Sequence, residues 1–273
     1  MVVTSGSGAV AQQFTVRSPD HVDLAVWVDG EGPPLVLVHG SIQDHSISAA
    51  LVAELRADFT TYAMDRRGFG ASGDGPVYSL EREFADVATV VDAVADRTGH
   101  PVVLWGHSFG AGCAMGAAVL TRNVSHLVLY EPGLGLAYPA GWIDRAEKVV
   151  ADGDFEAAIV MVLRDLLEFT DEQIAERRSE PAWAGRVATA PTVVREARAE
   201  QRWSYRHGML DGIVAPTLML AGSQSPPAVR EATNAALTAI PSARTRVLVG
   251  HAHVAHRTDP AMVAAIIRDF ALS

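Results

Sequence analysis

Cysteine and lysine are almost absent from this 273-residue chain, and the scarcity of cysteine excludes a class of site. Cys113 is the single cysteine, so the chain cannot form an intramolecular disulfide or a cysteine-based metal cluster, and it needs no oxidising compartment. Lys148 is the single lysine among 22 basic residues, and the arginines are spread along the chain without a basic run. A formal charge of −10 adds to the case against a nucleic-acid partner.

Long apolar runs are missing as well. No segment approaches the roughly 20 apolar residues that a membrane span needs. The first 13 residues have neither the basic start nor the apolar stretch of a signal peptide, so we expect residues 1–13 to form a flexible tail and the protein to be cytoplasmic, with no membrane partner. The sequence also has no acidic cluster or His/Asp spacing typical of a metal site. The composition, 49% hydrophobic and 20% charged, is that of a globular protein with a substantial core.

Short apolar runs alternate with helical patterns along most of the chain. Residues 14–28 alternate apolar and polar side chains around Pro19-Asp20, which predicts an antiparallel hairpin. Unbroken apolar runs, typical of parallel strands buried on both faces, follow at 35–38, 61–64, 102–105 and 127–130, and further strands are expected at 217–220 and 246–249. Helical patterns lie between these runs, most clearly at 79–97, 227–239 and after Thr258-Asp259-Pro260. The sequence thus predicts an α/β fold with a doubly wound, mostly parallel, eight-stranded sheet.

One segment interrupts the alternation. Residues 133–211 show helical periodicity without a convincing strand, and 155–167 form the clearest apolar helix face. We expect this segment to be a helical cap or lid, inserted into a core made of residues 14–132 and 212–273. It would lie over the carboxyl edge of the sheet.

A Gly-x-Ser-x-Gly motif marks the first candidate for chemistry. Gly106-His107-Ser108-Phe109-Gly110 follows a predicted buried strand and precedes a helix rich in alanine and glycine. A sharp turn from strand to helix exposes the serine oxygen, and small residues on either side avoid backbone clashes. The motif in this context predicts that Ser108 is a nucleophile.

A serine hydroxyl needs a base to take its proton, and histidine is the usual one. Three candidates lie near the end of the chain: His251, His253 and His256. His253 stands a few residues beyond the last strand, where a loop can reach over the sheet edge, and is favoured as the general base. His251 is expected to shape the turn after Gly250 and stays open as an alternative base, whereas His256 is expected to be a solvated surface residue.

At these positions the chain resembles the α/β-hydrolase superfamily. The resemblance covers nearly all of the chain after residue 20 and is carried by four motifs in the family's order: His39-Gly40, the stretch from Asp65 to Ser72, the Ser108 motif, and Gly250–His253. It implies an α/β-hydrolase sheet, no cofactor, and a structural turn without a catalytic role at 65–72.

The resemblance also implies particular site residues. Ser108 would be the nucleophile and His253 the base. The backbone N–H groups of Phe109 and of a residue just after His39-Gly40, here Ser41, would form the oxyanion hole.

The acid of the triad is where the chain departs from the family's commoner pattern. Most members carry an aspartate in the loop after the strand that corresponds to 217–220, but residues 222–227 contain no carboxylate. A neutral serine or glutamine there could orient the imidazole without stabilising its charged form. In some relatives the acid lies at the end of the preceding strand, and Glu131 stands at that place here. We predict Glu131 as the acid; the alternative is a solvated residue, or one paired with an arginine of the lid.

These residues predict a serine hydrolase that cleaves an ester, lactone or related acyl bond of a small to medium hydrophobic substrate through an acyl-enzyme. Serine in place of aspartate at the nucleophile argues against dehalogenation and epoxide hydrolysis. The missing carboxylate leaves open a non-catalytic ligand-binding relative, and cleavage of a carbon–carbon bond is a further alternative. The substrate and the oligomeric state stay open, a homodimer being one alternative.

Overall fold

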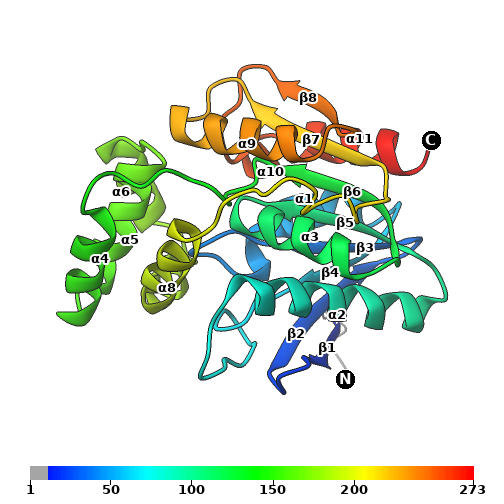
Figure 1. Cartoon of the computed structure of the whole chain (residues 1–273), viewed down its shortest axis with the longest axis horizontal. Coiled ribbons are helices and arrows are strands. Elements are labelled where there is room, and N and C mark those ends of the chain that lie inside the picture. Colours follow the sequence, from blue (N-terminus) through cyan, green and yellow to red (C-terminus); the bar gives the residue numbers. More distant parts are fainter. Residues whose placement is uncertain (1–11) are drawn as a thin grey trace, which may run out of the picture.

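The computed structural model describes residues 12–273 and contains one eight-stranded sheet with helices on both faces (Figure 1). The strand order is β1-β2-β4-β3-β5-β6-β7-β8. β2 pairs antiparallel with β1 and β4, and all other pairs are parallel. The strands are β1 Gln12–Arg17, β2 Asp23–Gly30, β3 Pro34–Val38, β4 Thr60–Met64, β5 Val102–His107, β6 Val124–Tyr130, β7 Thr217–Gly222 and β8 Arg244–Leu248.

The predicted fold class, the hairpin and the six strands that follow it are confirmed. Of these six strands β8 is the most exposed, since Leu248 is its one buried residue. β3 and β5 are buried at every residue, as an unbroken apolar run requires of a strand covered on both faces. The start of the chain differs in part, because β1 begins at Gln12 and pairs it with Val28, so the predicted tail is two residues too long. The remainder of that tail, residues 1–11, lies outside the described residues.

Three helices of the core cover each face of the sheet. On one face lie α2 Leu80–Thr98, α3 Phe109–Leu120 and α9 Pro227–Ala239, and on the other α1 Ala49–Leu55, α10 Ala255–Thr258 and α11 Pro260–Ala271. A short 3₁₀ turn, η1 His45–Ser48, leads into α1. Among these described helices, none is both long and apolar enough to cross a membrane.

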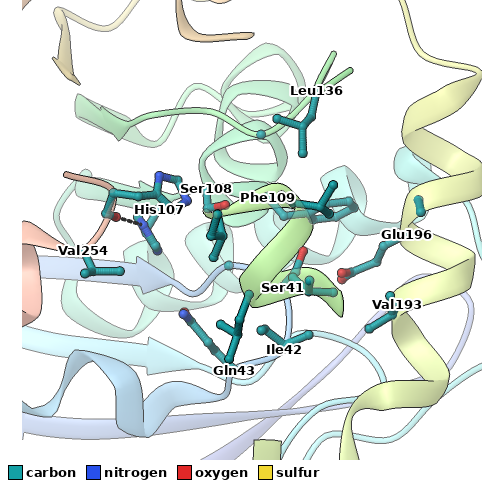
Figure 2. A pocket seen from close by; sticks show the side chains of 18 of the residues that line it. Ser41, Ile42, Gln43, His107, Ser108, Phe109, Leu136, Val193, Glu196 and Val254 are labelled. Atoms are coloured by element: carbon teal, nitrogen blue, oxygen red, sulfur yellow. Dashed lines mark hydrogen bonds between the residues drawn. The ribbon is translucent and has the colours of Figure 1, made fainter. Parts of the chain in front are cut away.

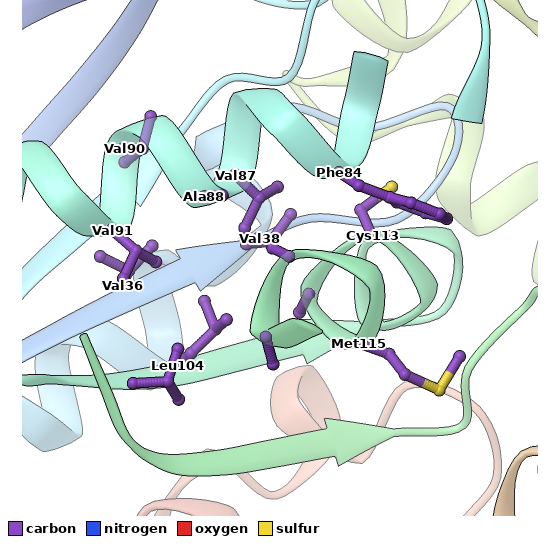
Figure 3. Close-up of a cluster of buried hydrophobic side chains, with 14 of the residues drawn as sticks. Val36, Val38, Phe84, Val87, Ala88, Val90, Val91, Leu104, Cys113 and Met115 are labelled. Atoms are coloured by element: carbon purple, nitrogen blue, oxygen red, sulfur yellow. The ribbon is translucent and has the colours of Figure 1, made fainter. Parts of the chain in front are cut away.

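α2 forms where the sequence predicts it. The Ser79 side chain caps its first turn by accepting from the Arg82 amide, and Gly99, with φ of 72°, ends it in the left-handed conformation. Its apolar face packs on α3 and on β3 and β5 (Figure 3). α3 must approach closely, because a Cβ on Gly116 would lie 2.3 Å from the Phe84 ring. The small residues of α3, the helix that follows Ser108, thus allow α2 to pack closely against it.

Residues 133–211, here named the helical insertion, lie between β6 and β7 and contain α4 Trp142–Ala151, α5 Phe155–Met161, η2 Val162–Leu166, α6 Asp171–Arg178, α7 Trp183–Ala188 and α8 Ala190–Gln201. The insertion stands beside the sheet in Figure 1 and has an apolar cluster of its own, which Ile42 from the loop after β3 joins. The single helix predicted over 155–167 is α5 continued by the π-helical turn η2. There the Leu167 amide bonds back to the Val162 carbonyl, five residues earlier.

Candidate active site

Ser108 lies at the turn between β5 and α3 with φ of 55° and ψ of −126°, a conformation that non-glycine residues rarely adopt. Its amide donates to the Tyr130 carbonyl at 2.9 Å, and its carbonyl accepts from the amides of Ala111 and Gly133 at 2.9 Å each. This network holds the strained residue in place. The sharp strand-to-helix turn predicted from the Gly-x-Ser-x-Gly motif is present, with Ser108 half-buried and the residues on either side buried.

The two glycines of the motif are required by backbone packing. A Cβ on Gly106 would lie 2.5 Å from the Ala111 Cα, and a Cβ on Gly110 would lie 2.2 Å from the His39 carbonyl oxygen. Any side chain at either position would push α3 away from β5 or from the loop after β3. The close approach places that loop directly against Ser108.

The loop after β3 carries the predicted oxyanion residue Ser41. A Cβ on Gly40 would lie 3.0 Å from the Ser108 Cβ, and Ser41, Ser108 and Phe109 line the same pocket (Figure 2). His39 has a structural place, because its Nδ1 donates to the Gly40 carbonyl and its Nε2 accepts from the Arg66 amide. Burial lowers the pKa of His39 to about 3, so it is neutral at physiological pH.

Glu131 and His253 lie in contact. His253 Nδ1 donates to Glu131 Oε2 at 2.6 Å, and the Gly222 amide donates to Glu131 Oε1 at 2.6 Å. Glu131 is fully buried and has a φ of 47°, so it too lies in the left-handed region. Glu131 is therefore not solvated, as it would be expected to be in a non-catalytic relative. None of the described ion pairs joins its carboxylate to an arginine.

Two residues beneath the site hold the His253 loop, and the sequence analysis did not predict either contact. His107 Nε2 donates to the His253 carbonyl at 2.7 Å, and burial holds the pKa of His107 well below its usual value. The Tyr130 hydroxyl donates to the Ala252 carbonyl and accepts from the Ala255 amide at 3.1 Å. Both residues come from strand ends next to Ser108 and Glu131.

The loop after β7 does not contact the imidazole with a side chain. Ser225 is buried and its Oγ has no hydrogen-bond partner among the described residues. The loop contributes backbone instead: the Gly222 amide to Glu131, and the Gln224 amide to the His251 carbonyl at 2.9 Å.

The two other histidines near the end of the chain lie apart from Glu131. His251 is partly exposed, its Nε2 lies 3.8 Å from Asp259 Oδ2, and its amide donates to the Leu248 carbonyl at 3.2 Å. The prediction that His256 is solvated is wrong: it is 1% exposed and packs against the rings of Trp105, His107 and Tyr130. Burial lowers the pKa of His256 to about 3. The short helix α10 turns its side chain under the site rather than out to water.

The helical insertion lines the pocket that contains Ser108 and His253. Its apolar lining comes mostly from the insertion and includes Leu136, Trp142, Val162, Leu163, Leu166, Leu167, Phe169, Val193 and Ala197. Three aromatic residues of the insertion, Tyr138, Trp142 and Phe169, line this pocket. Trp203 and Tyr205 do not: Trp203 packs edge-on against Phe84, and the Tyr205 hydroxyl donates to the Leu134 carbonyl.

Charged side chains in this pocket are the main feature that sequence reasoning missed. Glu196 and Glu200 on α8 are buried, and burial raises the pKa of both, that of Glu200 to about 8. Glu196 pairs with buried Arg66, and its carboxylate points toward Ser41 in Figure 2. Glu200 accepts from the Tyr138 hydroxyl. The sequence signal was available, because Val193, Glu196, Ala197 and Glu200 follow the spacing of one helix face.

Three arginines, Arg177, Arg186 and Arg257, also line the pocket. Two come from the helical insertion and the third from α10, directly after the His253 loop. Nothing in their sequence context separates them from the other arginines of the chain.

A second group of titratable residues lies outside the pocket and consists of Asp44, His45 and Asp65. Their side chains place three potential metal-ligand atoms close to one another. The carboxylate of Asp65 is already occupied: it accepts from the amides of His45 and Ala71, the His45 ring and the Trp27 indole. These bonds anchor η1 and the 65–72 turn. The turn therefore has the structural place that the sequence predicts.

The comparisons with known proteins agree with this geometry. Residues 35–266 match the model of the alpha/beta hydrolase family. A 2-(acetamidomethylene)succinate hydrolase from Mesorhizobium japonicum is 33% identical over 122 residues, 42% of each chain. A pimeloyl-[acyl-carrier protein] methyl ester esterase from Xylella fastidiosa is 33% identical over 106 residues, 39% of each chain. The matched parts thus span less than half the length of these curated relatives.

Solved structures match over nearly the whole chain. An alpha/beta hydrolase from Sphaerobacter thermophilus is 29% identical with a TM-score of 0.81, covering 94% of this chain and 99% of its own. A malate-bound thermophilic esterase from Thermogutta terrifontis is 26% identical with a TM-score of 0.70, covering 95% and 97%. The match of the family model over most of the chain, together with the sheet order and these structures, shows that this chain belongs to the alpha/beta hydrolase family of enzymes.

Proposed function

We propose that this enzyme is a serine hydrolase that cleaves an ester, lactone or related acyl bond, with Ser108, His253 and Glu131 as its catalytic triad. The observation that carries the proposal is the 2.6 Å contact between His253 Nδ1 and Glu131 Oε2, in a loop that shares a pocket with Ser108. A buried carboxylate in this position fixes the imidazole tautomer with the proton on Nδ1. Nε2 is then free to accept a proton from the serine.

In the first half of the reaction the Ser108 oxygen attacks the acyl carbon, and its proton passes to His253 Nε2. The tetrahedral oxyanion accepts hydrogen bonds from the Phe109 and Ser41 amides, and the imidazolium is stabilised by Glu131. The bond to the leaving alcohol then breaks, and His253 gives the alcohol its proton. An acyl-enzyme on Ser108 remains.

In the second half His253 takes a proton from water, and the hydroxide oxygen attacks the acyl carbon. The bond to Ser108 breaks, and the serine oxygen recovers the proton from His253. The product is the free acid. Every proton is returned, so no cofactor is needed for this chemistry.

The helical insertion serves, in this proposal, as the cap that binds the substrate. Its apolar side chains form most of the pocket wall, which suits a small to medium substrate with an apolar part. Relatives support hydrolysis at an acyl carbon, since one is named as a methyl ester esterase and another as a hydrolase of an acetamido compound.

A fluorophosphonate probe and a short p-nitrophenyl ester test the proposal directly. We expect wild type to be labelled and to release p-nitrophenol, Ser108→Ala to do neither, and Ser41→Ala, which keeps its backbone amide, to be labelled. The proposal fails if wild type is not labelled, or if Ser108→Ala hydrolyses the ester as fast as wild type. Product analysis on carbonyl substrates separates acyl-bond cleavage from carbon–carbon bond cleavage.

A further inference from the structure

Arg186 of α7 is a buried cation without a described counter-ion. Its exposed fraction is 8%, it lines the pocket that contains Ser108 and His253, and no carboxylate of residues 12–273 lies within ion-pair distance of it. Burial of a guanidinium is unfavourable unless an anion compensates it. Burial and the positive charge of Arg257 lower the pKa of Arg186 only to about 10, so it stays charged at neutral pH.

The neighbours of Arg186 do not neutralise it. Arg177 and Arg257 line the same pocket, and both pair with Glu180, the latter at 3.0 Å. Asp44 is the other carboxylate near Arg186, and it already accepts from the amide and hydroxyl of Ser46. Three guanidinium groups thus share two carboxylates, which leaves this part of the pocket with an excess of positive charge.

Among the described ion pairs, none joins Arg186 to the pocket's other carboxylates, Glu196 and Glu200. Glu196 pairs with Arg66, which itself contacts Glu83 at 3.3 Å. Glu200, with its pKa raised to about 8 by burial, is mostly protonated at neutral pH. Most of the remaining lining that comes from the helical insertion is apolar.

We propose that Arg186, with Arg177 and Arg257 beside it, binds a free carboxylate of the substrate, so that the enzyme acts on acyl compounds that carry a second, ionised acid group. The planar guanidinium is suited to this because it can give a carboxylate two parallel hydrogen bonds. The reaction at the acyl carbon rests on the proposed function, whereas the anion site stands on the arginine cluster alone.

A matched pair of substrates tests the proposal. Mono-p-nitrophenyl glutarate and p-nitrophenyl pentanoate have similar length and differ in the terminal carboxylate. We expect wild type to favour the glutarate ester in kcat/KM by roughly 10- to 100-fold, the range for hydrogen bonds to a charged group. Arg186→Gln should reduce that ratio at least tenfold. Arg178→Gln, an exposed α6 arginine paired with Glu156, should leave it unchanged.

Binding of free glutarate, measured by calorimetry on the intact protein, gives a readout that needs no turnover. We expect wild type and Ser108→Ala to bind glutarate and Arg186→Gln to lose at least tenfold in affinity, with thermal melts confirming that each variant folds. If no ester is hydrolysed but glutarate binds through Arg186, the proposed function falls and the anion site stands.

The opposite outcome overturns the anion site alone. Wild type would then hydrolyse both esters at similar kcat/KM and show no measurable affinity for glutarate. Because wild type decides this comparison, the test holds even if Arg186→Gln does not fold.

Discussion

The Gly222 amide donates a 2.6 Å hydrogen bond to Glu131 Oε1, which joins the end of β7 to the residue that follows β6. The same carboxylate accepts from His253 Nδ1 through its other oxygen. The loop after β7 contains no acidic side chain, yet its backbone fixes the orientation of an acid that comes from the neighbouring strand. A buried carboxylate with both oxygens hydrogen-bonded is well placed to hold a histidine ring in one orientation.

Replacement of Glu131 by glutamine tests this arrangement. Glutamine can still accept from the Gly222 amide, but it cannot stabilise an imidazolium, and its amide nitrogen would favour the wrong His253 tautomer. We expect kcat for a p-nitrophenyl ester to fall by roughly 10²- to 10⁴-fold, with the melting temperature close to that of wild type.

Ser225→Ala is the matched control, because Ser225 is buried in the loop after β7 and its hydroxyl has no described partner. It should keep nearly full kcat. If Ser225→Ala lost activity and Glu131→Gln kept it, the orienting role would belong to the loop after β7.

Close backbone contacts predict the effect of Gly110→Ala. The added Cβ would lie 2.2 Å from the His39 carbonyl oxygen and 2.6 Å from that of Val38, and neither backbone atom can move without shifting the loop that carries Ser41. We expect the free energy of unfolding in urea to fall by about 3 kcal/mol or more. Gly185→Ala, in α7 with no atom near its would-be Cβ, should be neutral or stabilising by up to about 1 kcal/mol. Equal effects of the two substitutions would contradict the prediction.

The sequence carried enough information for the parts of the site that depend on the sheet. Ser108 and Glu131 each follow an apolar strand, and parallel strands bring their carboxyl ends to one edge, so their proximity could be inferred from residue order. The contact between Glu131 and His253 was expected, but the Gly222 amide that completes it was not, because a backbone donor leaves no mark in residue type.

The charged pocket residues could not be assigned for a different reason. Glu196, Glu200 and Arg186 lie on helices whose packing against the sheet depends on the path of the whole insertion, and helical periodicity specifies a face without specifying its neighbour. His256 illustrates the same limit in the last turn before α11. Its burial follows from the direction of the four-residue helix α10, which the local sequence does not determine.

Buried His256 predicts a loss of stability in acid. Its pKa is about 3 in the folded protein and about 6.5 in the unfolded chain, so between these values the unfolded state binds one more proton. Stability is therefore full above about pH 6.5 and is lost as the pH falls toward 3. His256→Phe should make the fall in unfolding free energy shallower by about 1.4 kcal/mol per pH unit. Urea unfolding between pH 5 and 7 measures this slope, and the exposed His207→Phe should leave it unchanged.

Glu200 predicts the opposite dependence at higher pH. Burial raises its pKa to about 8 from 4.5, so between these values the folded state holds a proton that the unfolded chain has lost. The contribution of Glu200 to stability is present below about pH 4.5 and is lost as the pH rises toward 8. Glutamine is neutral at every pH and can still accept from the Tyr138 hydroxyl. As the pH rises within this range, the free energy of unfolding of Glu200→Gln should therefore increase relative to that of wild type by roughly 1.4 kcal/mol for each pH unit.

Urea unfolding of wild type and Glu200→Gln between pH 5.5 and 8.5 provides the measurement, with the exposed Glu176→Gln as control. Parallel curves for wild type and Glu200→Gln would mean that Glu200 is ionised in the folded protein at neutral pH. The pocket would then hold a second negative charge beside Glu196, and the excess of positive charge around Arg186 would be correspondingly smaller. The same titration thus bears on whether the pocket is suited to an anionic substrate.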